Sequence, residues 1–179
     1  MNLWSVCMLP PEEICKTPLD LMYYPGPWIE ITPIRAALWH LQQEERVNWK
    51  IRVIQGTRHL AALTSGAAPD ILVTHWHGEY REPEYFSPTF EIARRLRRQR
   101  GSFSNSGGPF LVGQVSTDRR GLEVVERLDI YDMLIARPPC FDDFAKNLAI
   151  GMNRMVHSDS QLQFDVDFPV ISCGNTKIA

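Results

Sequence analysis

The feature that most constrains this chain is a regular alternation of short apolar segments with amphipathic helical segments. Five apolar segments predict strands, at residues 19–24, 49–55, 71–76, 110–115 and 132–136. Each is followed by residues whose apolar positions recur every three or four places, the period of a helix. Strict alternation of strands and helices requires crossover connections, which place the strands parallel and the helices on both faces of the sheet. The sequence therefore predicts an α/β fold with a five-stranded parallel sheet.

The length and composition fit one globular domain with additions at both ends. The chain has 179 residues, of which 44% are hydrophobic and 22% are charged. These are ordinary values for a folded domain of this size. We expect the α/β domain to span residues 18–155, preceded by an N-terminal arm at 1–17 and followed by a C-terminal extension at 156–179.

The two end segments lie outside the alternation. Residues 1–17 contain a Pro-Pro break and a few apolar residues, and we expect an extra strand or a docking arm. Residues 162–170 alternate apolar and non-apolar positions, which predicts an amphipathic strand. Pro169 confines such a strand to a sheet edge, either of this domain or of a partner.

Three segments, in this order and at this spacing, resemble the receiver domain of bacterial response regulators, which has a flavodoxin-like fold. Residues 69–75 (Pro-Asp-Ile-Leu-Val-Thr-His) look like the third receiver strand, which usually ends in the phosphorylated aspartate. Residues 131–138 (Tyr-Asp-Met-Leu-Ile-Ala-Arg-Pro) look like the fifth strand, which usually ends in Lys-Pro. Residues 141–144 (Phe-Asp-Asp-Phe) begin a last helix much as the family does.

The resemblance also implies where a phosphoacceptor pocket would lie. A receiver needs an acidic pair after the first strand to hold Mg²⁺, a cation that prefers oxygen ligands. Tyr23 and Tyr24 stand at the positions of the acidic pair, and His75 stands at that of the phosphorylated aspartate. Gln114 (or Ser116 in a shifted register) matches the switch hydroxyl, and Arg137 matches the lysine. Because no carboxylate is left among them, we expect a pseudo-receiver that is not phosphorylated on aspartate and has no cofactor.

A second interpretation of the third strand's end is a metal site. Residues 74–80 (Thr-His-Trp-His-Gly-Glu-Tyr) are similar to the Thr-His-x-His-x-Asp-His signature of metallo-β-lactamase-type hydrolases. His75, His77 and Glu79 are the candidate zinc ligands, since two imidazoles at this spacing can hold zinc. However, Glu79 replaces the aspartate and Tyr80 the third histidine of that signature. That fold also lacks a plain five-fold strand–helix alternation, so a zinc hydrolase remains the alternative hypothesis.

The favoured hypothesis is a phosphorylation-independent regulatory module, in bacterial signalling or transcription control, that acts through a protein partner or as a homodimer. Candidate contact residues are the aromatic side chains of the loop after the third strand, Trp76, Tyr80, Tyr85 and Phe86, because aromatic residues dominate binding energy.

Direct nucleic-acid binding is not expected, because the net charge is −2 and the arginine-rich segment at 94–100 lacks interleaved aromatic residues. No apolar run is long enough to span a membrane. The four scattered cysteines form no Cys-x-x-Cys motif, so a reduced, cytoplasmic protein is expected.

Overall fold

The computed structural model describes residues 2–26, 31–44, 46–63, 68–75, 88–100, 108–115, 130–136, 143–157 and 170–173. Their helices and strands follow one another in this order: α1 (Leu3–Cys7), α2 (Pro11–Lys16), β1 (Leu19–Tyr24), α3 (Thr32–Gln43), β2 (Trp49–Val53), α4 (Thr57–Ala62), β3 (Ile71–His75), α5 (Pro88–Arg100), β4 (Phe110–Val115), β5 (Met133–Ala136), α7 (Phe144–His157) and β6 (Val170–Cys173).

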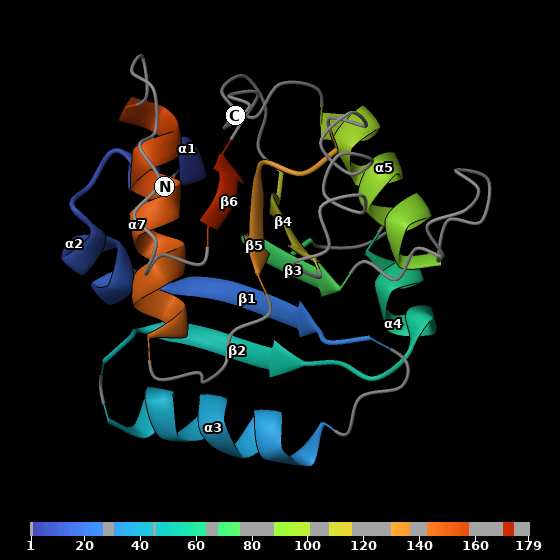
Figure 1. Cartoon of the computed structure of the whole chain (residues 1–179), viewed down its shortest axis with the longest axis horizontal. Helices are drawn as coiled ribbons and strands as arrows, with labels where there is room; N and C mark the ends of the chain where they lie inside the picture. The colour runs from blue at the N-terminus through green and yellow to red at the C-terminus, as the bar shows by residue number, and fades with distance from the viewer. Residues whose placement is uncertain are drawn as a thin grey trace.

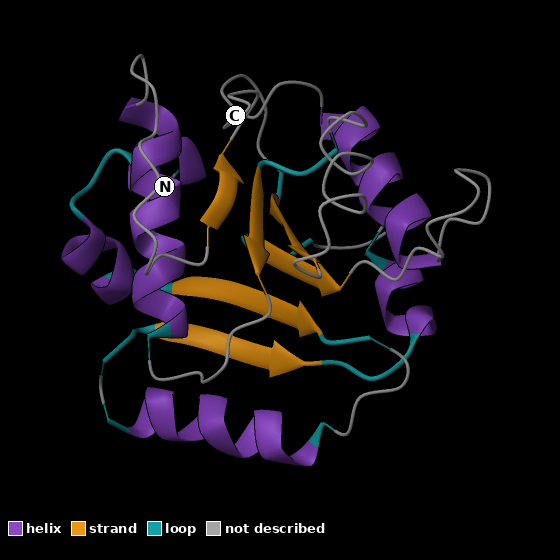
Figure 2. Ribbon diagram, in the orientation of Figure 1, coloured by secondary structure: helices purple, strands orange, loops and turns teal. Residues whose placement is uncertain are grey.

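These strands form one twisted sheet in the order β2-β1-β3-β4-β5-β6 (Figure 2). Strands β1 to β5 are parallel to their neighbours, whereas β6 runs antiparallel to β5. The order 2-1-3-4-5 of the parallel strands is that of the flavodoxin-like doubly wound fold. The predicted fold class, a five-stranded parallel sheet with helices on both faces, is confirmed.

The strand residues alternate between two cores, one on each face of the sheet. Tyr23 and Val73 belong to the core under α1, α2, α3 and α7, whereas Tyr24 and Leu72 belong to the core under α4 and α5. Figure 1 shows the same division, with α4 and α5 on the opposite side of the sheet from α7. Such two-sided burial is why the strands read as continuous apolar runs rather than as alternating ones.

The predicted central strand lies in the middle of the sheet. Ile71, Leu72 and Val73 are fully buried, and β3 pairs with β1 on one side and β4 on the other. The strand ends at His75, one residue earlier than predicted, and Trp76 lies outside the described residues. The helix expected between β4 and β5 also falls on residues that the structure leaves undescribed.

The N-terminal arm forms two short helices, so the expectation of an extra strand there is wrong. The Asn2 side chain accepts a hydrogen bond from the Trp4 backbone N–H at 3.1 Å and thereby caps α1. Helices this short are marginal in water and depend on tertiary packing. That packing comes from α7, whose Asn153 side-chain amide donates to the Leu9 carbonyl at 2.8 Å and the Cys7 carbonyl at 3.3 Å.

A strand in the C-terminal extension pairs with the edge of the chain's own sheet. It begins at Val170, the last residue of the predicted segment, while residues 162–169 lie outside the described part. Its antiparallel pairing with β5 covers an edge that would otherwise expose unpaired backbone groups. In the described residues, no helix is long and apolar enough to cross a membrane.

Candidate functional site

The candidate site is the edge of the sheet where the parallel strands end, because doubly wound folds bind their ligands at this edge. Tyr23 and Tyr24 end β1, His75 ends β3, and Gln114 is next to last in β4, paired in register with His75. The sequence-predicted positions therefore lie on neighbouring strands. Only the backbone of His75 is described, and Arg137 lies outside the described residues.

The structure joins two of these positions directly. The Tyr23 hydroxyl donates a hydrogen bond to Gln114 Oε1 at 2.6 Å, although the residues are 91 positions apart in the sequence. The bond crosses above β3, the strand that separates β1 from β4. Both side chains are 1% exposed, so a neutral hydrogen-bonded pair occupies this part of the edge.

Phe144, from the first turn of α7, packs on this pair. Its ring meets the Tyr23 ring edge-on, with centroids 5.6 Å apart and planes at 75°. This is a favourable geometry for two aromatic rings. Because Phe144 is itself 3% exposed, the tyrosine is enclosed by the sheet below it and by α7 beside it.

A second hydrogen-bonded pair lies on the opposite face of the sheet. Thr74 Oγ1 and Tyr131 Oη are 3.0 Å apart, and either hydroxyl can donate. Burial raises the pKa of Tyr131 to about 12, and the hydrogen bond with Thr74 opposes this shift only in part. The phenol is therefore neutral over the physiological pH range.

Gly113 makes room for the Tyr131 ring to cross β4. A Cβ atom at position 113 would lie 2.8 Å from a Tyr131 ring carbon and 2.7 Å from Leu134 Cδ2. Real Cβ contacts are longer than this, so any larger residue would displace one of these buried side chains. The pair on this face thus depends on a glycine in the neighbouring strand.

The described aspartates of the sheet lie at the amino-terminal ends of the strands, opposite the candidate site. Asp20 binds the Arg52 guanidinium through both oxygens at 3.1 and 2.7 Å, and Asp70 Oδ2 accepts from the Asp20 N–H at 2.8 Å. Asp132 accepts from Arg97 at 3.1 Å and from the Leu111 N–H at 2.8 Å. These acids are engaged in holding strands together and lie away from the candidate site.

The described part of the site therefore has the chemistry of a packed core rather than of a hard-cation site. Mg²⁺ needs carboxylate or other oxygen ligands in near-octahedral geometry. The described strand ends offer phenol, amide and hydroxyl groups, of which Tyr23 is bonded to Gln114 and Thr74 to Tyr131. No group of three or more histidine, cysteine, aspartate or glutamate side chains in the described residues could hold a metal ion.

The zinc-hydrolase hypothesis is not supported by the fold, which is a doubly wound sheet with its parallel strands in the order β2-β1-β3-β4-β5. His77 and Glu79 lie outside the described residues, as do the predicted contact residues Trp76, Tyr80, Tyr85 and Phe86.

Sequence reasoning missed Thr74, Tyr131 and Phe144 as parts of this site. Thr74 had a visible signal, since a hydroxyl in an otherwise apolar buried strand needs a hydrogen-bond partner. The partner itself, Tyr131, is 57 residues away and could not be assigned without the strand order.

No protein-family model matches this sequence, and no curated protein matches it. Among solved structures, the chain is similar to the signal receiver domain of a signal transduction histidine kinase from Syntrophus aciditrophicus. That similarity has a TM-score of 0.49 at 15% identity and covers 82% of this chain and 98% of that one. It is also similar to the beryllofluoride-activated NtrC receiver domain, with a TM-score of 0.42, 16% identity and coverage of 80% and 97%.

Proposed function

We propose that this chain is a pseudo-receiver, a phosphorylation-independent regulatory module of bacterial signalling or transcription control. It acts in the cytoplasm through contacts with a protein partner or a second copy of itself. The proposal rests on the receiver-like order of sequence landmarks at 69–75, 131–138 and 141–144. It is supported by the 2-1-3-4-5 order of the parallel strands.

The observation that carries the proposal is the hydrogen bond between Tyr23 and Gln114. Phosphoryl transfer to a receiver aspartate requires a carboxylate nucleophile and a bound Mg²⁺ at the strand ends. Here a 2.6 Å bond between two buried neutral side chains fills the space between β1 and β4, and Phe144 packs on it. These side chains include no carboxylate that could accept a phosphoryl group or bind Mg²⁺, which supports an input other than aspartate phosphorylation.

Protein contact is the output that this arrangement favours. Trp39 on α3 is 55% exposed, an unusual state for a large aromatic side chain in the described part of the chain. Aromatic anchors of this kind contribute strongly to binding energy. We therefore add Trp39 to the contact residues predicted from the sequence, Trp76, Tyr80, Tyr85 and Phe86.

The test is incubation of the full chain with acetyl phosphate and Mg²⁺, followed by intact-mass measurement. We expect no added phosphate, while a phosphorylatable receiver treated in parallel gains one. A stable phosphate on any aspartate of this chain would refute the proposal. Light scattering of the wild type and Trp39→Ala then tests the contact role, since loss of an oligomer is expected for this variant.

A further inference from the structure

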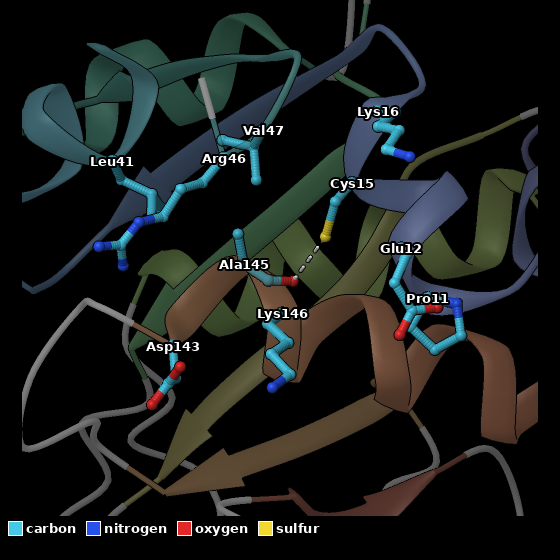
Figure 3. Close-up of a pocket in the computed structure, with 10 residues that line it drawn as sticks. All are labelled: Pro11, Glu12, Cys15, Lys16, Leu41, Arg46, Val47, Asp143, Ala145 and Lys146. Atoms are coloured by element: carbon cyan, nitrogen blue, oxygen red, sulfur yellow. Dashed lines mark hydrogen bonds between the residues drawn. The ribbon is translucent and has the colours of Figure 1, made fainter. Parts of the chain in front are cut away.

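A cavity of about 280 Å³ lies between α2, the end of α3 and the first turn of α7 (Figure 3). None of its lining residues belongs to the Tyr23–Gln114 or Thr74–Tyr131 pairs. Its volume is near the lower end of the range for small-molecule pockets. The cavity therefore suits a ligand of a few non-hydrogen atoms rather than a nucleotide or a peptide.

The floor of the cavity is apolar. Leu41, Val47 and Ala145 are buried there, and the Cys15 thiol points toward the Ala145 carbonyl oxygen at 4.0 Å (Figure 3). Burial is the main cause that raises the pKa of the Cys15 thiol, so the thiol stays neutral. A floor of this kind favours a branched aliphatic group, because burying apolar surface is the main source of affinity.

The rim carries charges of both signs, from three separate elements. Glu12 and Lys16 come from α2, and Arg46 precedes β2. Asp143 directly precedes α7, and Lys146 lies in its first turn. Lys16 pairs with Glu13 at 3.5 Å, and Arg46 pairs with Glu44 at 2.7 Å. Neither glutamate lines the cavity.

Lys146 forms no ion pair within 4 Å in the part of the chain that the structure describes. Its charge nevertheless interacts with the Cys15 thiol on the cavity floor. Glu12 raises the pKa of this thiol, whereas Lys146 lowers it. A negative and a positive group thus act on the same small space from α2 and from α7.

We propose that this cavity binds a small zwitterion with an apolar side chain, that is, an apolar α-amino acid of about the size of leucine. The side chain lies on the floor, the ammonium group faces the acidic groups of the rim, and the carboxylate faces Lys146. A purely apolar ligand would bury rim charges without compensation, which costs free energy. A ligand with one charge would match only one sign of the rim. The proposal is independent of the pseudo-receiver function, because the cavity is lined by no residue of the Tyr23–Gln114 or Thr74–Tyr131 pairs.

The first experiment is calorimetric titration of the full chain with L-leucine and two analogues. 3-Methylbutan-1-amine lacks the carboxylate, and 4-methylpentanoate lacks the ammonium group, while both keep the branched chain. We expect saturable leucine binding and at least tenfold weaker binding of each analogue, since a hydrogen bond to a charged group is lost in each case. Absence of leucine binding at millimolar concentration, or an analogue that binds as tightly as leucine, would overturn the proposal.

The second experiment uses exposed residues, whose substitution leaves the fold intact. Glu12→Gln and Lys146→Met each remove one charge from the rim, and Lys50→Met removes an exposed charge of β2 that does not line the cavity. We expect the first two variants to bind leucine at least tenfold more weakly and the control to bind it as the wild type does. Equal affinity in all four proteins would show that leucine binds elsewhere and would refute this site.

Alkylation of Cys15 provides a readout that does not depend on affinity. Peptide mapping after prolonged iodoacetamide treatment at mildly alkaline pH, at which leucine is still a zwitterion, follows the modification of this thiol separately from the other cysteines. Saturating leucine should slow modification of Cys15, because the ligand covers the cavity floor on which the thiol lies. An unchanged rate at saturation would contradict the proposal.

Discussion

Removal of the Tyr23 hydroxyl is the most direct test of how the candidate site is held together. The Tyr23→Phe substitution keeps the ring that packs on Phe144 but removes the donor that lies 2.6 Å from Gln114 Oε1. Gln114 is 1% exposed, so water cannot replace the lost donor without a rearrangement. A buried acceptor that loses its partner costs about 1–3 kcal/mol of unfolding free energy, and we expect a loss in this range.

A double-mutant cycle separates this hydrogen bond from other effects of the substitution. Gln114→Met replaces the amide by an apolar side chain of similar length. When both partners are replaced by apolar groups, the cost is small compared with that of leaving one partner alone. The double variant Tyr23→Phe/Gln114→Met should therefore lose less stability than the two single variants added together, with a coupling of about 1 kcal/mol or more.

The assay is urea unfolding followed by the fluorescence of the five tryptophans. Stabilities are comparable only if the slope of free energy against urea is unchanged between variants. Losses that add within about 0.5 kcal/mol would refute the reasoning, because they would show that the two side chains are energetically independent.

Four further predictions concern the rest of the fold. Leu72→Ala should cost about 2–5 kcal/mol in urea unfolding, because this fully buried leucine leaves a cavity. His75→Ala should cost far less, and equal losses would instead indicate a structural metal at His75. Gly113→Ala should cost about 1–3 kcal/mol by overpacking against Tyr131 and Leu134, and a neutral result would show that β4 can shift freely. Removal of residues 158–179 should expose the edge of β5 and cause association visible by light scattering, whereas an oligomeric state equal to that of the full chain would contradict the role of β6. Because burial raises the pKa of Tyr131 from 10.0 to about 12, its contribution to stability is complete below pH 10 and is lost as the pH rises to 12. Between pH 10 and pH 12, the unfolding free energy of Tyr131→Phe should therefore fall less than that of the wild type. An equal fall in both proteins would show that the pKa of the Tyr131 phenol is not raised.

The sequence by itself determined the elements of the sheet. Strand β1 and strand β4 begin and end where the apolar patterns predict, at residues 19–24 and 110–115. Local patterns suffice there because a strand covered on both faces must be apolar throughout, and the crossover rule then makes the strands parallel. The sequence also showed that the positions matching the receiver's acidic pair and phosphorylated aspartate hold no carboxylate.

Local patterns failed where packing supplies the stability. The N-terminal helices have too few residues to form alone, and α7 holds them through Asn153. In the C-terminal extension, the described strand at 170–173 pairs with the edge that β5 offers, and residues 162–169 of the predicted strand lie outside the described part.

Only the tertiary structure decided what occupies the candidate site. Tyr23 and Gln114 lie 91 positions apart, and Thr74 and Tyr131 lie 57 apart, so their hydrogen bonds follow from the strand order β1-β3-β4-β5 and not from any local motif. The cavity between α2, α3 and α7 likewise exists only because three distant segments meet. A sequence specifies which backbone conformation each segment prefers, but side chains from distant segments become neighbours only when burial of the two cores fixes how the segments pack.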